Sequence, residues 1–291
     1  MVRLFIICNA FLVLLSAKMT VSVSIAPQAF FVKKIAGDLV DINVMVDQGK
    51  SPETYEPNIS QVKELSKSSV YFLIGMPFEN AWKSRFKNAN PKMKIIPPLK
   101  SNVLDEYMNQ YPKNTIVHSP IGNFNNSKNL HDRHAPHIWL SFVLSAEHAK
   151  NITQTLKDID PSNKDIYENN LQDFLASINS LFIESKQYVK NSNIKTFLVY
   201  HPAFSYMANE LGLVEIAIEK HGKEAKISHM QDVLALIKAH NINSILVQPQ
   251  FSKRSAEVIA REANLNIAIA DPLEYNWLDN MRNIVKTICS H

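Results

Sequence analysis

Short apolar runs alternate along the chain with stretches in which apolar residues recur every three or four positions. Runs such as Val70–Ile74 and Phe197–Tyr200 contain β-forming residues without polar alternation, which is typical of strands buried on both faces. Asn58 precedes a stretch with helical spacing and is a suitable N-cap for a helix over 59–66. The alternation predicts an α/β fold with parallel, doubly wound sheets. The runs that predict strands are 20–25, 41–46, 70–74, 93–96, 195–200, 213–218, 244–248 and 266–270.

One helical stretch, which begins at Asp160-Pro161, is longer than any other in the chain. At a rise of 1.5 Å per residue, its roughly 28 residues span about 40 Å, which is enough to cross a two-domain protein. We therefore expect two doubly wound α/β lobes, at 18–160 and 192–291, joined by one long rigid helix at 161–191. The apolar stripe of this helix, with spacings of mostly three and four, consists of Tyr167, Leu171, Phe174, Ile178, Leu181 and Tyr188.

The first 17 residues have the pattern of a secretory signal peptide. Arg3 is their one charged residue, and the almost wholly apolar run Leu4–Leu15 is followed by two small residues. The run is too short for a stable membrane-spanning helix, although an N-terminal membrane anchor is the alternative. Cys8 lies inside the run rather than at its end, so we expect no lipid anchor. After cleavage Cys289 would remain alone, so we expect an exported protein without an internal disulfide.

The composition of the 291-residue chain, with 46% apolar and 20% charged residues, is that of a globular protein. The formal net charge of +4 is spread along the chain without a dense basic block, which argues against a nucleic-acid partner. Residues 101–133 are rich in Asn, Ser, Lys and His and predict a long mobile loop, whose histidines either collect metal loosely or are simply solvated. The histidines that we expect at the surface elsewhere are His148, His221 and His240.

Four candidate ligands follow predicted strands or lie in adjoining loops: Glu53, His137, His201 and Asp271. His201 and Asp271 each end an apolar run, at the carboxyl end of a parallel strand, where open α/β sheets bind their ligands. For His201 alone, a strand cap satisfied by a backbone carbonyl is the alternative. Two imidazoles and two carboxylates suit a divalent first-row metal, and a cleft between the lobes is a favoured place for it.

Several longer motifs resemble those of the extracytoplasmic zinc- and manganese-binding proteins of ABC importers, the high-affinity zinc uptake type. They occur in the family's order, and the resemblance covers about residues 20–288. It implies two α/β lobes joined by one long rigid helix. The motifs are SPETYEP (Ser51–Pro57), PHIWLS (Pro136–Ser141), YHPAFSYM (Tyr200–Met207), the segment Glu219–Glu224, VQPQFS (Val247–Ser252) and DPL (Asp271–Leu273).

The resemblance implies a metal held at the positions of His137, His201 and Asp271. The fourth position is usually a histidine in a Pro-His-x-Tyr-Glu-Pro motif, and this chain has Glu53 there. The additional oxygen ligand favours Mn²⁺, and Fe²⁺ more weakly, whereas imidazole favours Zn²⁺. The expected cargo is therefore Zn²⁺ or Mn²⁺. Without Glu53 the site would have three protein ligands and a water, and Glu56 is a weaker substitute.

Together these features predict a periplasmic solute-binding protein that captures a divalent transition metal in the interdomain cleft and delivers it to an ABC permease in the inner membrane. We expect a monomer without enzymatic activity. One alternative is a secreted metal-dependent hydrolase, which would need an open metal position and a general base, and would show turnover. The other is an adhesin-like surface protein, which would bind a host protein even after loss of the metal ligands.

Overall fold

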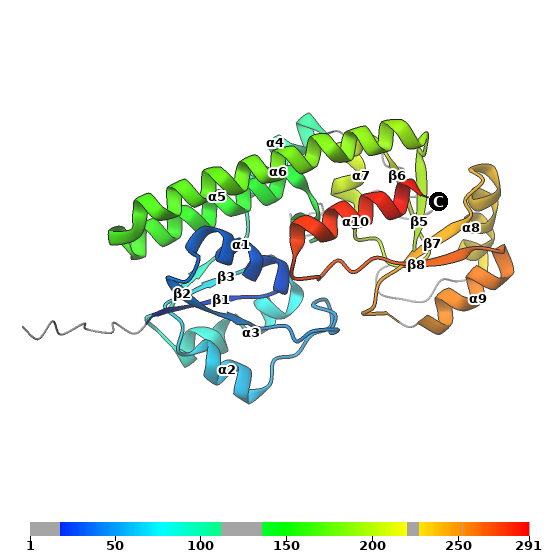
Figure 1. The fold of residues 1–291 in the computed structure, drawn as a ribbon. Helices are drawn as coiled ribbons and strands as arrows, with labels where there is room; N and C mark the ends of the chain where they lie inside the picture. The colour runs from blue at the N-terminus through cyan, green and yellow to red at the C-terminus, as the bar shows by residue number, and fades with distance from the viewer. Residues whose placement is uncertain (1–17, 112–135, 220–226, 252, 291) are drawn as a thin grey trace, which may run out of the picture.

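The computed structural model describes residues 18–111, 136–219, 227–251 and 253–290. The expected signal peptide at 1–17, the loop histidines between 112 and 135, and His221 lie outside these residues. Two α/β lobes lie beneath one long helix, the first drawn in blue and cyan and the second mainly in yellow and orange (Figure 1).

The first lobe contains a four-stranded parallel sheet in the order β2-β1-β3-β4. Val21 in the central strand pairs with Ile42 on one side and Val70 on the other, and both neighbours run parallel to it. The strands are β1 (Met19–Val23), β2 (Val40–Val44), β3 (Val70–Phe72) and β4 (Lys94–Ile96). The helices are α1 (Ala26–Ala36), α2 (Ile59–Leu65), α3 (Pro77–Ala89), α4 (Ser101–Gln110) and α5 (Phe142–Ile159).

The second lobe has the same construction, with parallel strands in the order β6-β5-β7-β8. The first strand of each lobe, β1 or β5, occupies the same place in its sheet, so the two sheets have the same strand order at their carboxyl edges. The strands are β5 (Thr196–Val199), β6 (Val214–Ala217), β7 (Ser244–Val247) and β8 (Asn266–Ile269). The helices are α7 (Ser205–Leu211), α8 (Ile227–Ala239), α9 (Lys253–Ala263) and α10 (Trp277–Cys289).

The long helix α6 (Lys164–Ser192) has 29 residues and follows a short 3-10 turn, Pro161–Asn163. It packs on α1 and α5 toward one end and on α7 and α10 toward the other, so it contacts both lobes. The two parallel sheets and this helix confirm the predicted fold class. The residues predicted for the apolar stripe of α6 are buried except Tyr188, which is 36% exposed. The helical period places Ser185 and Val189 on the buried face instead.

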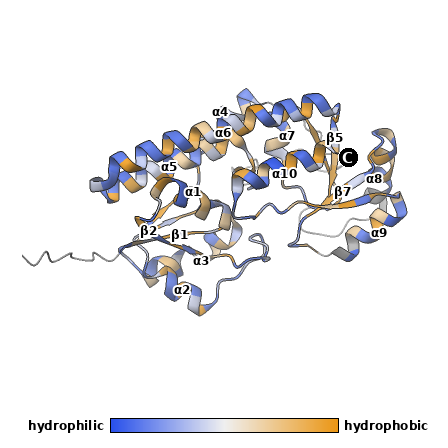
Figure 2. Ribbon diagram, viewed as in Figure 1, coloured by the Kyte–Doolittle hydropathy of each residue, from blue (hydrophilic) through white to orange (hydrophobic). Residues whose placement is uncertain are grey.

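The apolar residues form one large core and a smaller one. The large core joins the first lobe to α6, α7 and α10, and the smaller one lies between the second sheet and helices α8 and α9. Figure 2 shows the orange apolar stripes of the helices that cover these cores. Among the described residues, no helix combines the length and apolar character needed to cross a membrane.

The predicted loop at 101–133 is wrong in its first third, where residues 101–110 form α4. Val103, Leu104 and Met108 pack against the large core and Tyr107 is buried in it, at helical spacing. Because many polar residues lie between these positions, the sequence of α4 does not show a clear apolar periodicity. Asn58, by contrast, is the N-cap that the sequence predicts, because its Oδ1 accepts a hydrogen bond from the Gln61 amide at 3.0 Å.

Candidate metal centre

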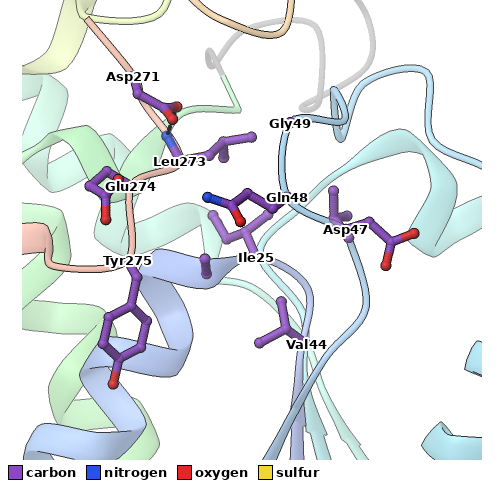
Figure 3. A pocket seen from close by; sticks show the side chains of 11 residues that line it. Ile25, Val44, Asp47, Gln48, Gly49, Asp271, Leu273, Glu274 and Tyr275 are labelled. Carbon is purple, nitrogen blue, oxygen red and sulfur yellow. Dashed lines mark hydrogen bonds between the residues drawn. The ribbon is translucent and has the colours of Figure 1, made fainter.

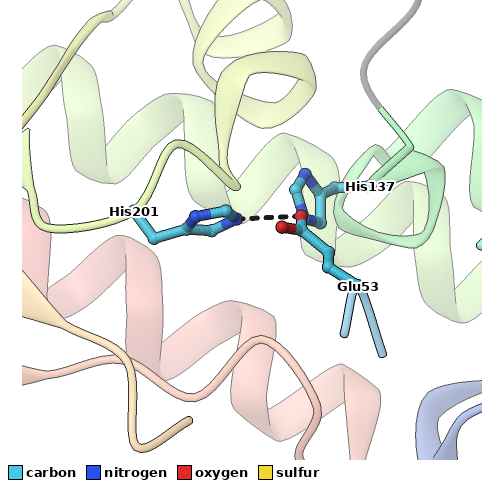
Figure 4. Close-up of side chains that lie close together, drawn as sticks. All are labelled: Glu53, His137 and His201. Carbon is cyan, nitrogen blue, oxygen red and sulfur yellow. Dashed lines mark hydrogen bonds and ion pairs between the residues drawn. The ribbon is translucent and has the colours of Figure 1, made fainter. Parts of the chain in front are cut away.

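Glu53, His137 and His201 come together between the lobes (Figure 4). Oε1 of Glu53 lies 3.1 Å from Nε2 of each histidine, and the three potential ligand atoms are all within 4.8 Å of one another. Glu53 is in the loop between β2 and α2, His137 precedes the 3-10 turn Ile138–Leu140, and His201 follows β5. The cluster therefore draws on both lobes.

Hydrogen bonds and ring stacking fix His201 in the orientation in which its Nε2 faces Glu53. Its Nδ1–H donates to Oε2 of Glu219 at 2.7 Å, which leaves the lone pair of Nε2 available in the neutral ring. The amide of Gln248 accepts from the His201 backbone N–H at 3.2 Å and donates to its carbonyl at 2.7 Å. The ring stacks on Phe251, with centroids 4.4 Å apart. These contacts fix both the position and the tautomer of the ring.

His137 is positioned by the turn that follows it. The Leu140 N–H donates to the His137 carbonyl at 3.0 Å, and the Trp139 ring lies 5.3 Å from the imidazole between ring centroids. Trp139 is anchored in turn, because its Nε1–H donates to the Pro272 carbonyl at 2.7 Å and its own carbonyl accepts from Trp277. These bonds connect His137 to the 271–277 segment of the second lobe.

The Glu53 loop is tied to the end of β2. The Tyr55 hydroxyl donates to the Met45 carbonyl at 2.7 Å, and Nε2 of Gln61 donates to the same carbonyl at 3.0 Å. The Tyr55 ring packs against Phe78. Glu56, in the same loop, is exposed and is not among the three clustered residues.

The cluster is strongly buried, and burial and pairing act differently on its members. Both histidines are 5% exposed, whereas the Glu53 side chain is 24% exposed. Burial lowers the pKa of His137. Burial also opposes the charge on His201, but hydrogen bonds to Glu219 and Glu53 raise its pKa to about 9. For Glu53, the two histidine hydrogen bonds outweigh burial and hold the pKa well below its ordinary value, so the carboxylate is ionised.

This donor set fits a divalent cation. Two imidazole nitrogens and a carboxylate are ordinary ligands of first-row metals. Ligands about 2.1 Å from a tetrahedral ion lie about 3.4 Å from one another. The distance of 3.1 Å from Glu53 to each histidine is close to this value, and all three ligand atoms lie within 4.8 Å. A metal would displace any proton that the Nε2 atoms of the histidines direct toward Glu53.

Asp271 is not part of the clustered group. It follows β8, and its Oδ1 accepts hydrogen bonds from Nε2 of Gln250 at 2.7 Å and from the Leu273 N–H at 2.9 Å. The Asp271 side chain lines a cavity of about 370 Å³ together with Gln48 and Glu274 (Figure 3). Leu273 lines both this cavity and the pocket of the cluster. The structure thus brings three of the four predicted ligands together and places the fourth beside them.

Three supporting residues are not predicted as site residues by the sequence. Gln248 and Gln250 follow a predicted strand and could face the cleft, but a structural role was favoured for both, and Glu219 is noted only within a motif. Each lies just beyond a strand, β6 or β7, at the carboxyl edge of the second sheet. A position just after a parallel strand is the sequence feature that could identify them, because ligands of such sheets bind at this edge. By contrast, His148, expected at the surface, is buried at 1% exposure because it lies on the inner stripe of α5 with Ile152.

Comparison with known proteins agrees with this geometry. The family described as ZnuA, zinc-uptake complex component A, periplasmic, matches residues 21–290. The high-affinity zinc uptake system protein ZnuA of Bacillus subtilis is 23% identical over 259 residues, which are 88% of this chain and 79% of the relative. The manganese ABC transporter substrate-binding lipoprotein PsaA of Streptococcus mitis is 27% identical over 245 residues, covering 81% and 74%.

A crystal structure of ZnuA is 32% identical and superposes with a TM-score of 0.80 over 94% of this chain and 99% of that chain. The match of the family over almost the whole chain also excludes the hydrolase alternative, because the family consists of non-catalytic binding proteins of transport systems. The chain belongs to the ZnuA family of metal-binding proteins that serve ABC importers.

Proposed function

We propose that this protein binds Zn²⁺ or Mn²⁺ as cargo through Glu53, His137, His201 and Asp271 and hands it to the permease of an ABC importer. The observation that carries the proposal is the convergence of Glu53 and the two histidines within 4.8 Å, from loops of both lobes. A buried site whose ligands are all supplied by the protein binds an ion without leaving a position for chemistry.

Asp271 belongs to the proposed ligand set because its neighbours reach the cluster. Pro272 and Leu273 line the same pocket as Glu53 and His201, and Asp271 itself borders the adjoining cavity. The resulting site would have two nitrogen and two oxygen ligands.

The identity of the cargo follows from this donor set. Oxygen ligands favour Mn²⁺ and imidazoles favour Zn²⁺, while Zn²⁺ binds most such sites more tightly. Relatives of this chain are named for each metal. We propose that Zn²⁺ binds more tightly and that Glu53 keeps useful affinity for Mn²⁺.

The protein is an extracytoplasmic binding protein by its family. We propose that it works in the periplasm as a monomer without a lipid anchor and docks on a permease in the inner membrane. Support comes from the apolar run at residues 4–15, in which Cys8 is internal. Mass spectrometry of the exported protein tests this, because a lipid-modified cysteine at a new N-terminus contradicts it.

The test of cargo binding is a competitive titration of the metal-free protein with Zn²⁺ and Mn²⁺ against a chelator. Wild type should bind one ion per chain, and Glu53→Gln should weaken binding of both metals. Glu56→Gln, an identical change three residues away on an exposed side chain, is the matched control and should behave as wild type. Absence of stoichiometric binding of either metal would overturn the proposed function.

A further inference from the structure

Gln250 connects Asp271 to the clustered residues. Its Nε2–H donates to Oδ1 of Asp271 at 2.7 Å, and its side chain lines the same pocket as Glu53, His137 and His201. It lies three residues beyond β7, in a turn closed by the bond from the Phe251 N–H to the Gln248 carbonyl, at 3.2 Å.

The turn that carries Gln250 is fixed to His201 on both sides of the glutamine. Gln248 makes two hydrogen bonds with the His201 backbone, and Phe251 stacks on the His201 ring. The position of Gln250 relative to His201 is therefore set by its own neighbours in the chain. Through Nε2, the same turn also reaches Asp271, so it links one clustered histidine to the separate carboxylate.

The two ends of the Gln250 amide are in different situations. Nε2 is paired with Asp271, while Oε1 is buried and has no hydrogen-bond partner among the described residues. A buried carbonyl oxygen that stays unpaired costs about 1–3 kcal/mol. An apolar residue would fill this place without such a cost, so the bond from Nε2 to Asp271 is what a glutamine contributes here.

Among the residues that the structure describes, the donors to Asp271 bond only one of its two carboxylate oxygens. Gln250 and the Leu273 N–H both donate to Oδ1. A carboxylate held at one oxygen by two donors has a restricted orientation and keeps the other oxygen for a ligand. Outer hydrogen bonds of this kind orient the metal ligands of proteins and tune their affinity.

We propose that Gln250 is a positioning residue of the metal site, which orients Asp271 through Nε2. This inference rests on the proposed role of Asp271 as a ligand. The 248–251 turn would then keep His201 and Asp271 in a fixed position relative to each other.

The test is a double-mutant cycle for Zn²⁺ affinity with Gln250→Leu, Asp271→Ala and the combined variant. Gln250→Leu should weaken binding about tenfold, as the loss of an outer hydrogen bond to a ligand does. Asp271→Ala should weaken it at least as much, and the combined variant should match Asp271→Ala, because Gln250 acts through that carboxylate. Gln187→Leu, the same change on an exposed residue of α6, is the control and should have no effect.

The visible spectrum of bound Co²⁺ reports on the ligands of the ion, so it distinguishes a change at the metal site from a general loss of packing. The visible absorption of the Co²⁺ protein should change in the same direction in Gln250→Leu and Asp271→Ala, with the melting temperature of the metal-free protein unchanged. Gln250→Asn, which keeps the amide but is one methylene shorter, should reproduce the loss if Gln250→Leu folds poorly.

The outcomes separate this inference from the function on which it rests. Wild-type affinity in both Gln250 variants, or additive losses in the cycle, would overturn the role of Gln250 while leaving metal binding intact. An Asp271→Ala variant that binds Zn²⁺ as wild type would overturn it too. Failure of the wild-type protein to bind metal would instead remove the proposed function itself.

Discussion

Oε2 of Glu219 lies 2.7 Å from Nδ1 of His201, on the opposite side of the ring from Nε2, which faces Glu53. Glu219 is 7% exposed, so this carboxylate has little contact with water. It fixes the histidine tautomer in which Nε2 is free to bind an ion, and it increases the basicity of that nitrogen.

Replacement of Glu219 by Leu should therefore reduce Zn²⁺ affinity by a factor of about 10 to 100, because His201 loses its orientation. Glu219→Gln, which retains an acceptor oxygen, should lose much less. Chelator competition on both variants measures the difference. Equal losses in the two variants would mean that the charge of Glu219, and not its hydrogen bond, is what His201 requires.

The identity of residue 53 should set the metal preference. Glu53→His converts the clustered group to three imidazoles, and imidazole favours Zn²⁺ whereas oxygen favours Mn²⁺. The ratio of Zn²⁺ to Mn²⁺ affinity should therefore rise by at least about tenfold, as measured by parallel titrations. The exposed Glu56→His is the control for an added histidine in the same loop. An unchanged ratio in Glu53→His would show that residue 53 does not contact the ion.

His148 should make the metal-free protein less stable in mild acid. It is buried on α5, its Nε2 accepts a hydrogen bond from the Gln28 amide at 3.1 Å, and burial lowers its pKa to about 4. The unfolded chain, with a pKa near 6.5, binds a proton in this range that the folded state does not, so stability falls as pH decreases from about 6.5 toward 4.

The expected contribution of His148 is a loss of about 2 kcal/mol in the free energy of unfolding between pH 7 and pH 5. Urea unfolding of the metal-free protein at the two pH values measures it. His148→Gln keeps an acceptor for Gln28 and should lose less stability over this interval than wild type does. His240→Gln, at an exposed position, should show the wild-type difference.

Glu210 should be important for the connection between the lobes. This buried residue of α7 accepts hydrogen bonds at the start of α5, from the Ser141 hydroxyl and from the Phe142 N–H at 2.8 Å. Glu210→Leu leaves these donors unpaired and should cost about 2–4 kcal/mol of unfolding free energy. Glu147→Leu, at a partly exposed glutamate on α5, is the control, and equal losses in the two variants would contradict the expectation.

Much of the fold could be predicted because its signals are local. Buried parallel strands such as Phe197–Val199 have no polar alternation, and the Asn58 cap is a chemical preference of one helix end. Helix α4 was predicted as loop because its apolar residues are spread among many polar ones. The polarity of histidine predicts a surface position for His148, which is wrong because the residue lies on the inner face of its helix.

The candidate site could be predicted in part, for a different reason. His137, His201 and Glu53 are far apart in sequence, and the order of motifs, rather than their spacing, indicated that they belong together. The sequence does not specify side-chain rotamers, so it could not indicate that Asp271 pairs with Gln250 beside the cluster. Supporting residues such as Glu219 depend on the same tertiary detail.

Helix α6 limits the conformational change that can accompany metal binding. Its 29 residues pack along elements of both lobes, and the large core extends continuously through them, so the lobes cannot rotate apart without exposing apolar side chains to water. Loading the site therefore encloses almost no new apolar area, and its heat capacity change should be close to zero. The free energy of capture then comes from exchanging the hydration shell and a proton for protein ligands, and not from closing two halves around the ion.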